Sequence, residues 1–203
     1  MSARHQTEAW LFYGACDLYF SFHSEEWVFD YHSAFFAIMA LEKHLKAVLI
    51  YSKTNDFDSL SGKEAFEKAV DIAKSYGHDF PQMAAEVEVI LPGRSFSKVL
   101  DRSHDTYPGR DLIKVLRDSY METRYPTKRH VSMSFPVGEP NTYYNPLSSS
   151  GLHHFIQASC NSIVEGLTEA IDIDKMLRNV KEQYKHLEPF HRFQNIYVPG
   201  KWC

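Results

Sequence analysis

The chain has 203 residues, with 22 Lys and Arg against 26 Asp and Glu, so its formal net charge is -4. This length predicts one domain, and the charge balance excludes a protein that binds nucleic acid through bulk positive charge alone. The composition, 44% apolar and 24% charged, is that of a globular protein. No apolar stretch is long enough for a transmembrane helix.

The cysteines and the first residues bear on the cellular compartment. Cys16, Cys160 and Cys203 are an odd set without a CxxC pair, which is typical of reduced thiols. The first eight residues lack the apolar region of a signal peptide. We therefore expect a cytoplasmic protein with no membrane association.

Apolar residues follow helical spacing over most of the chain. Residues 7–24 predict one amphipathic helix, and residues 34–50 predict another with a clearer apolar stripe. Glu42, Lys43 and Lys46 are expected on the opposite, solvent-facing side of the second helix. The stripe consists of Ala34, Ala37, Ile38, Leu41, Leu45, Val48 and Leu49.

Two further helices are indicated by their ends. Ser61 and Glu64 have capping-box spacing and open a helix that Gly77 closes in a left-handed conformation. Asp79 then stands where the N-cap of a short helix is expected, and Pro92 ends that helix.

The second half of the chain alternates between helix and irregular sequence. Residues 111–124 predict a helix that Pro126 stops. Residues 126–150 are rich in Pro and Ser without periodicity, which predicts a long irregular loop. Residues 151–186 predict one long helix, and residues 187–203 form an aromatic C-terminal tail.

Together these elements predict an all-α fold. We expect an antiparallel up-and-down bundle of four to five main helices over residues 1–186, followed by the tail. No sheet is expected beyond a short hairpin within residues 126–150.

Charge is distributed unevenly along the chain. From Arg94 to His130 there are nine Lys and Arg against five Asp and Glu, a net of +4, while the remaining residues have a net charge of -8. A basic segment of this kind could face phosphate, although charge alone favours an ordinary solvated surface.

The sequence lacks the common signatures of catalytic and metal-binding sites. The chain has no phosphate-binding glycine loop, zinc-protease motif or serine-nucleophile elbow. Asp172 and Asp174 lie within a helical pattern, and the adjacent His153 and His154 point about 100° apart on a helix. We therefore expect no metal and no cofactor.

Three short segments stand out because they occur in a fixed order. They are Ala40-Leu41-Glu42-Lys43-His44-Leu45-Lys46-Ala47, then Tyr76-Gly77-His78-Asp79-Phe80, then Tyr120-Met121-Glu122-Thr123-Arg124-Tyr125-Pro126. With these three segments in this order, the chain resembles the HEPN (higher eukaryotes and prokaryotes nucleotide-binding) domain family. The resemblance covers roughly residues 10–130 by motif.

The resemblance implies a helical bundle that forms homodimers and acts on or near nucleotides or RNA, in some cases beside a separate nucleotidyltransferase protein. Some family members are metal-independent endoribonucleases with an Arg-x(4–6)-His motif at a dimer cleft. Here Arg124 and His130 are separated by five residues, which fits that spacing. A histidine can act as general acid or base, and an arginine can stabilise the charge that develops on phosphate.

We favour binding over catalysis for this chain. Tyr125 follows the arginine where the nuclease members carry a small polar residue, and Pro126 ends the helix before His130. The preferred hypothesis is a nucleotide- or RNA-binding protein that contacts phosphate through Arg124, Tyr125, Lys128 and Arg129. The alternatives are a toxin-like ribonuclease with Arg124 and His130 as catalytic residues, and a non-catalytic interaction module paired with a nucleotidyltransferase-type partner, as in a toxin-antitoxin system.

Overall fold

Helices form nearly all of the regular structure in the part of the chain that the computed structural model describes, residues 2–23, 30–91, 93, 95–104, 107–124, 150–183 and 197. The predicted all-α bundle is confirmed. In chain order the elements are α1 (Ala3–His23), α2 (Asp30–Ser52), a 3₁₀ turn (Thr54–Phe57), α3 (Gly62–Ser75), α4 (Phe80–Ile90), α5 (Ser95–Asp101), β1 (Ser103–His104), β2 (Tyr107–Pro108), α6 (Gly109–Arg124), α8 (Ser150–Leu167) and α9 (Ile173–Gln183).

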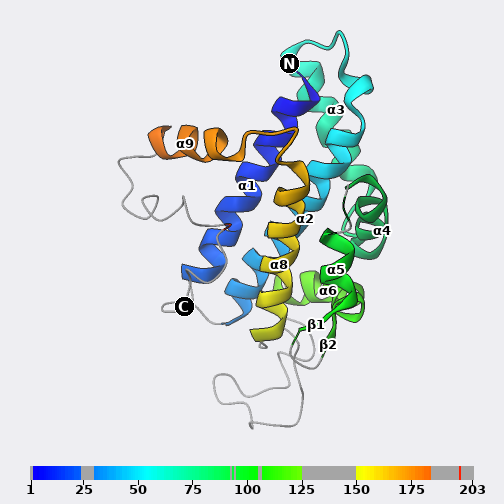
Figure 1. Ribbon diagram of the computed structural model, residues 1–203, viewed down its shortest axis with the longest axis vertical. Coiled ribbons are helices and arrows are strands. Elements are labelled where there is room, and N and C mark those ends of the chain that lie inside the picture. Colours follow the sequence, from blue (N-terminus) through cyan, green and yellow to red (C-terminus); the bar gives the residue numbers. More distant parts are fainter. Residues whose placement is uncertain are drawn as a thin grey trace.

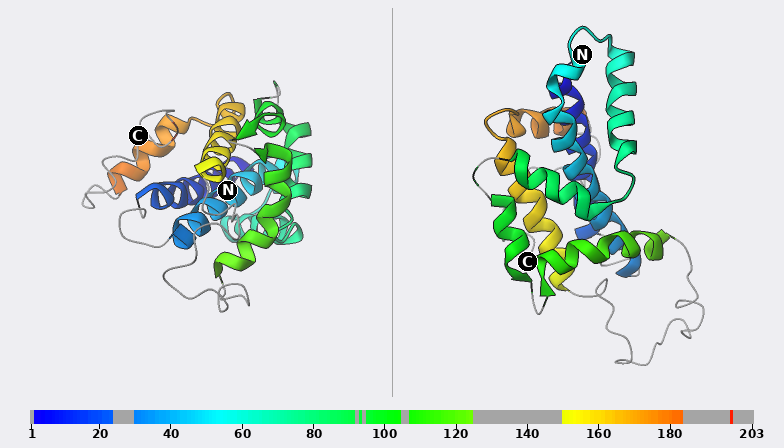
Figure 2. Two further views of the ribbon diagram at one scale, coloured as in Figure 1. Left: turned by 90° about the horizontal axis from the view of Figure 1, so that it is seen from below. Right: turned by 90° about the vertical axis from the view of Figure 1, so that its right-hand side faces the viewer.

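Helix α2 forms the centre of the bundle. It packs against α1, α3, α4, α6 and α8. Figure 1 shows α1, α2 and α8 side by side along the long axis, and Figure 2 shows α6 lying across that axis. The predicted apolar stripe of α2 is confirmed, because Ala37, Ile38, Leu41 and Leu45 are all buried.

The helix ends that depend on local capping are confirmed. Ser61 and Glu64 form a capping box at the start of α3, with the Ser61 backbone N–H donating to Glu64 at 2.8 Å. Gly77 has a φ of +53° after the end of α3, as a left-handed turn requires. Asp79 caps α4 by accepting a hydrogen bond from the backbone N–H of Gln82 at 3.1 Å.

The expected single helix over 151–186 is wrong. It is divided into α8 and α9 by a turn at residues 168–172. Asp172 accepts a hydrogen bond from the backbone N–H of Lys175 at 2.8 Å, and this side-chain bond starts α9. Ile171 and Ile173 are buried on either side of it, so the turn buries two apolar residues of the same segment.

Two small elements differ from the sequence expectation. Helix α5 was not anticipated because it is only seven residues long, although Phe96, Val99 and Leu100 give it a buried face. A short hairpin at residues 103–108, where Ser103 pairs with Pro108 and His104 with Tyr107, lies outside the segment in which a hairpin was expected. Residues 125–149, which contain all of the predicted loop except Ser150 at the start of α8, lie outside the described residues.

Three further sequence features can be located. Residue Tyr197 of the predicted tail packs against the core, and the rest of residues 187–203 lies outside the described part. Among the described residues Cys16 and Cys160 form no disulfide. No helix in this part of the chain is both long and apolar enough to cross a membrane.

Candidate functional site

Three segments that are far apart in the sequence meet where α2 and α6 pack beside the start of α4. Nδ1 of His78 lies 3.1 Å from each carboxylate oxygen of Glu42. The ring of His78 stacks on the ring of Tyr120, with centroids 4.0 Å apart and an angle of 27° between the planes. We call Glu42, Lys46, His78 and Tyr120 the His78 cluster.

The position of His78 is set by the turn between α3 and α4. Gly77 reverses the chain in a left-handed conformation that costs a glycine little. Asp79, on the other side of His78, is fixed by its hydrogen bond to the first turn of α4. His78 therefore stands between two restrained residues and points towards α2 and α6.

A buried ion pair forms the base of the cluster. Nζ of Lys46 lies 2.5 Å from Oε1 of Glu42, and the two side chains are only 7% and 5% exposed. Because an isolated charge inside a protein is strongly destabilising, the two charges stabilise each other only as a pair. Glu42 also accepts the hydrogen bond from His78, so its carboxylate joins α2 to the start of α4.

The outer edge of His78 remains accessible to solvent. Its side chain is 40% exposed, in contrast to that of Glu42. A carboxylate only accepts hydrogen bonds, so Nδ1 carries the proton and Nε2 is the nitrogen that can meet a ligand. Within the described part of the chain, Nε2 has no hydrogen-bond partner. An imidazole held in this way can bind a polar ligand or transfer a proton.

Of the predicted site residues, Arg124 is the one whose backbone is described. It is the last residue of α6 and lies four residues, about one helical turn, beyond Tyr120. Tyr125, Lys128, Arg129 and His130 lie outside the described residues, so their relation to Arg124 stays a prediction.

The expected exposure of two members of the His78 cluster, Glu42 and Lys46, is wrong. Glu42 and Lys46 were expected to face solvent, but they are 4% and 6% exposed. A signal was available, because residues 47–50 are consecutive apolar residues that cover every face of the helix, and a helix apolar on all sides is buried. His78 donates to Glu42, which lies 36 positions earlier in the chain, so no local pattern points to this contact.

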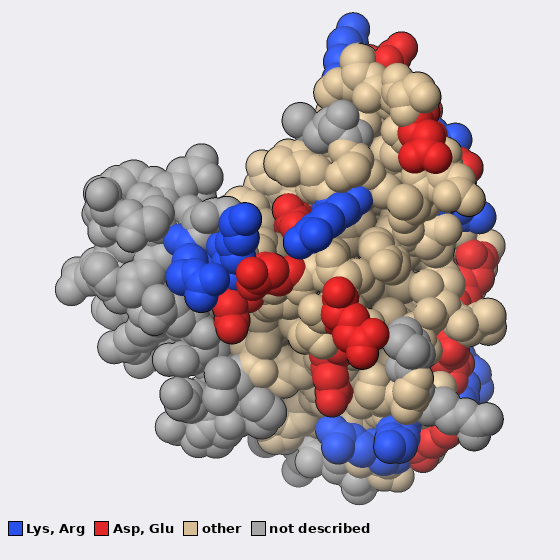
Figure 3. All heavy atoms as spheres, turned by 45° about the horizontal axis from the view of Figure 1, so that its top comes forward, with Lys and Arg blue, Asp and Glu red and all other residues tan. Residues whose placement is uncertain are grey.

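Charged side chains of both signs are mixed on one face of the bundle. On the face shown in Figure 3, Lys and Arg are interspersed with Asp and Glu, and no extended basic patch is seen on it. A phosphate group that binds on this face would therefore have to be recognised by a few local cations and not by a broad positive field.

Another histidine, His44, is buried and connects α2 to Tyr197 of the tail. Nδ1 of His44 donates to the backbone oxygen of Ala40 at 2.7 Å, and Nε2 accepts from the hydroxyl of Tyr197 at 2.8 Å. Burial lowers the pKa of His44 to about 4, with a smaller contribution of the same sign from Lys43. Because His44 is fully enclosed and neutral, it acts as a structural connector.

Comparison with known proteins identified no relative of this chain. No family model, no curated protein and no solved structure matches this chain.

Proposed function

We propose that this chain is a HEPN-like helical protein that binds a nucleotide or RNA and contacts phosphate through the region from Arg124 to His130. The supporting observation is the His78 cluster. It unites residues from all three segments on which the resemblance depends, and the third segment continues from Tyr120 directly to Arg124.

The charges of the cluster explain why the phosphate contact should come from Arg124 and its neighbours. Glu42 and Lys46 compensate each other inside the bundle, so they supply no net positive charge to a ligand. The cation must come from Arg124, with Lys128 and Arg129 close to it in sequence. An arginine suits this role because its planar guanidinium can donate two parallel hydrogen bonds to phosphate.

In this proposal His78 provides a polar contact beside the cation. Its Nε2 hydrogen-bonds to the ligand while Glu42 holds the ring in place. The proposal also includes a homodimer, as the resemblance implies. The ribonuclease and the interaction module remain alternatives that the following experiment separates.

The decisive experiment compares wild type with Arg124→Lys. Binding is measured by calorimetry against a set of nucleotides and by fluorescence anisotropy with a short unstructured RNA. Lysine keeps the charge but loses the planar fork, so we expect binding to weaken by roughly 1.5–3 kcal/mol with little change in thermal stability. The matched control is Arg178→Lys, an exposed arginine of α9.

The same preparation distinguishes the alternatives. Equal affinity of wild type and Arg124→Lys, or no binding by either, would contradict the proposal and leave the interaction module. Cleavage of the RNA in the presence of a metal chelator, abolished by His130→Ala, would establish the ribonuclease instead. For binding to single strands, the logarithm of affinity should fall with the logarithm of salt concentration with a slope of about -0.7 per phosphate neutralised.

A further inference from the structure

An open polar groove lies between α5, β1 and α8, on elements that do not contribute to the His78 cluster. Figure 1 shows α5 alongside α8 with the hairpin below them. The groove has a volume of about 840 Å³, which is in the range of small-molecule sites. The polar residues that matter to the argument are Lys98, Arg102, His154, Gln157, Asn161 and Glu165.

The wall on the α5 side presents two cations. Lys98 and Arg102 both line the groove, and neither has an ion-pair partner among the described residues. Asp101, which lies between them in sequence, is engaged elsewhere: it accepts from Nε of Arg110 at 2.7 Å.

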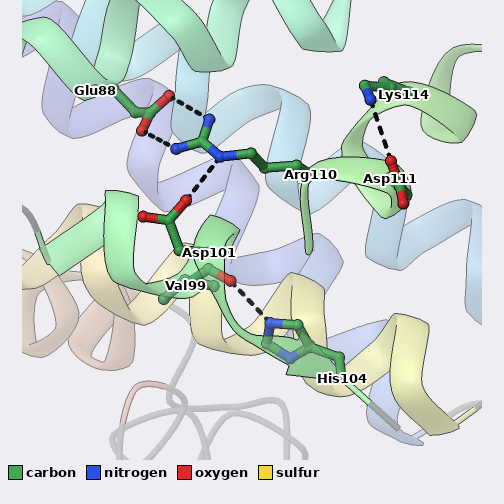
Figure 4. A network of polar contacts seen from close by, with 7 residues as sticks. All are labelled: Glu88, Val99, Asp101, His104, Arg110, Asp111 and Lys114. Carbon is green, nitrogen blue, oxygen red and sulfur yellow. Dashed lines mark hydrogen bonds and ion pairs between the residues drawn. The ribbon is translucent and has the colours of Figure 1, made fainter. Parts of the chain in front are cut away.

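Arg110 holds the neighbouring carboxylates away from the groove. Its two terminal nitrogens donate to the two oxygens of Glu88 at 2.9 and 3.1 Å, and its Nε donates to Asp101. Figure 4 shows this fork joining α4, α5 and α6, on the opposite side of α5 from His104. Asp101 and Glu88 are therefore compensated by Arg110, and Lys98 and Arg102 remain for an anion.

The wall on the α8 side presents amides. Gln157 and Asn161 lie one helical turn apart and both line the groove. Nε2 of Gln157 and Oδ1 of Asn161 are shielded from solvent without a hydrogen-bond partner. Such atoms are rare in folded proteins. Because these two atoms are enclosed, the groove is faced by the other atom of each amide, Oε1 of Gln157 as an acceptor and Nδ2 of Asn161 as a donor. A sugar hydroxyl group, which both accepts and donates, can bond to either of them.

The remaining lining residues narrow the ligand class. None of the described lining residues is Phe, Tyr or Trp, so these residues offer no aromatic platform on which a nucleobase could stack. Ser95, at the start of α5, bonds to the backbone of Ser162, and His104, just after α5, packs on Phe155, so the two helices run in opposite directions. Glu165 therefore lines the end of the groove opposite to Arg102 and would repel phosphate there. An anion is thus directed towards Lys98, Arg102 and the exposed His154.

We propose that this groove is a binding site for a small phosphorylated sugar. The phosphate is held by Lys98 and Arg102, and the sugar hydroxyls are held by the amides of Gln157 and Asn161. The proposal shares no residue with the His78 cluster and does not depend on the proposed function.

The test uses calorimetry on the full chain with glucose 6-phosphate and ribose 5-phosphate as probes. We expect a Kd at or below about 1 mM for at least one of them, with glucose and inorganic phosphate each binding about tenfold more weakly. Lys98→Ala and Arg102→Ala should weaken sugar phosphate binding about tenfold or more. The matched control is Lys74→Ala, an exposed lysine of α3 outside the groove.

The amide variants separate a built site from simple charge attraction. Gln157→Ala and Asn161→Ala should weaken sugar phosphate binding while leaving the affinity for inorganic phosphate unchanged, and thermal melts confirm that each variant is folded. No binding of either probe overturns the proposal. So does binding that the Lys98 and Arg102 variants leave unchanged, or binding lost in Arg124→Lys but retained in the groove variants.

Discussion

The hydroxyl of Tyr197 donates a hydrogen bond to Nε2 of His44 at 2.8 Å, although the two residues are 153 positions apart in the chain. His44 lies at the centre of α2, and its other ring nitrogen is already bonded to the backbone of Ala40. One hydrogen bond thus attaches position 197 to the central helix of the bundle.

Tyr197→Phe should therefore destabilise the protein. The substitution removes one hydroxyl and leaves Nε2 of His44 buried without a donor, which costs about 1–3 kcal/mol. Urea denaturation of both proteins measures the difference in the free energy of unfolding. Tyr13→Phe is the matched control, because Tyr13 is 59% exposed, and it should change stability by less than about 0.5 kcal/mol.

His44 should also make stability depend on pH. Burial lowers its pKa to about 4 in the folded protein, whereas an unfolded histidine titrates near 6.5. Because the folded pKa lies below the unfolded one, the contribution of His44 to the free energy of unfolding is fully present above about pH 6.5 and decreases as the pH falls. About 3 kcal/mol of stability should therefore be lost between about pH 6.5 and pH 4.

The measurement compares the free energy of unfolding at several pH values for wild type and His44→Gln. The variant loses packing at all pH values, but its stability should fall less steeply below about pH 6.5. Parallel curves for the two proteins would show that His44 is not the group responsible.

Gly14 permits the close approach of α1 to His44. A Cβ at this position would lie 2.6 Å from Nδ1 and 2.8 Å from Cε1 of the His44 ring. Gly14→Ala should cost about 1–3 kcal/mol through this clash, which outweighs the gain of up to about 1 kcal/mol in helix propensity.

Gly166→Ala provides the comparison for Gly14. Its Cβ would lie 3.1 Å from the side chain of Leu91. The end of a leucine side chain can shift, whereas the ring of His44 cannot, because it is enclosed and both of its nitrogens are hydrogen-bonded. Thermal melts should show a smaller cost for Gly166→Ala than for Gly14→Ala. The reverse order would mean that α1 is not held against α2 at His44.

Features that depend on neighbouring residues in the sequence could be predicted. The capping box of Ser61 and Glu64, the left-handed Gly77 and the N-cap of Asp79 each involve atoms within a few residues of one another. Apolar spacing likewise identified the buried stripe of α2, because periodicity reports directly on which face is covered.

Features that depend on distant contacts could not be predicted. The break after α8 follows from the burial of Ile171 and Ile173 against other elements, although their spacing along the chain resembles a continued helix. The His78 cluster required knowledge that α2 is covered on all sides, and that the turn before α4 faces Glu42 and not solvent.

The buried pair of Glu42 and Lys46 should behave as a unit. Glu42→Ala leaves the Lys46 ammonium buried without a partner and should cost about 3–5 kcal/mol. The double variant Glu42→Leu/Lys46→Met removes both charges and should be within about 1 kcal/mol of wild type or more stable. Urea denaturation of the three proteins tests this order.

A surface pair supplies the control for this prediction. Lys63 and Glu67 are 3.7 Å apart with side chains that are 85% and 59% exposed, so Glu67→Ala should cost less than about 1 kcal/mol. If Glu42→Ala were as mild as Glu67→Ala, the Glu42–Lys46 pair would not be shielded from solvent.

The proposed homodimer can be tested at two exposed aromatic residues of α1. Tyr13 and Phe20 are 59% and 45% exposed, and a separation of seven residues, about two helical turns, puts them on the same face. Association would remove both rings from water, which is the main driving force for such contacts. We expect sedimentation at micromolar concentration to show twice the chain mass of 23.5 kDa, and Tyr13→Ser/Phe20→Ser to shift the protein to the monomer.

Val89→Ser is the control, because Val89 is 86% exposed on α4, and it should leave the dimer intact. Wild-type protein that sediments only as a monomer would contradict the dimer, and with it the shared cleft on which the ribonuclease alternative depends.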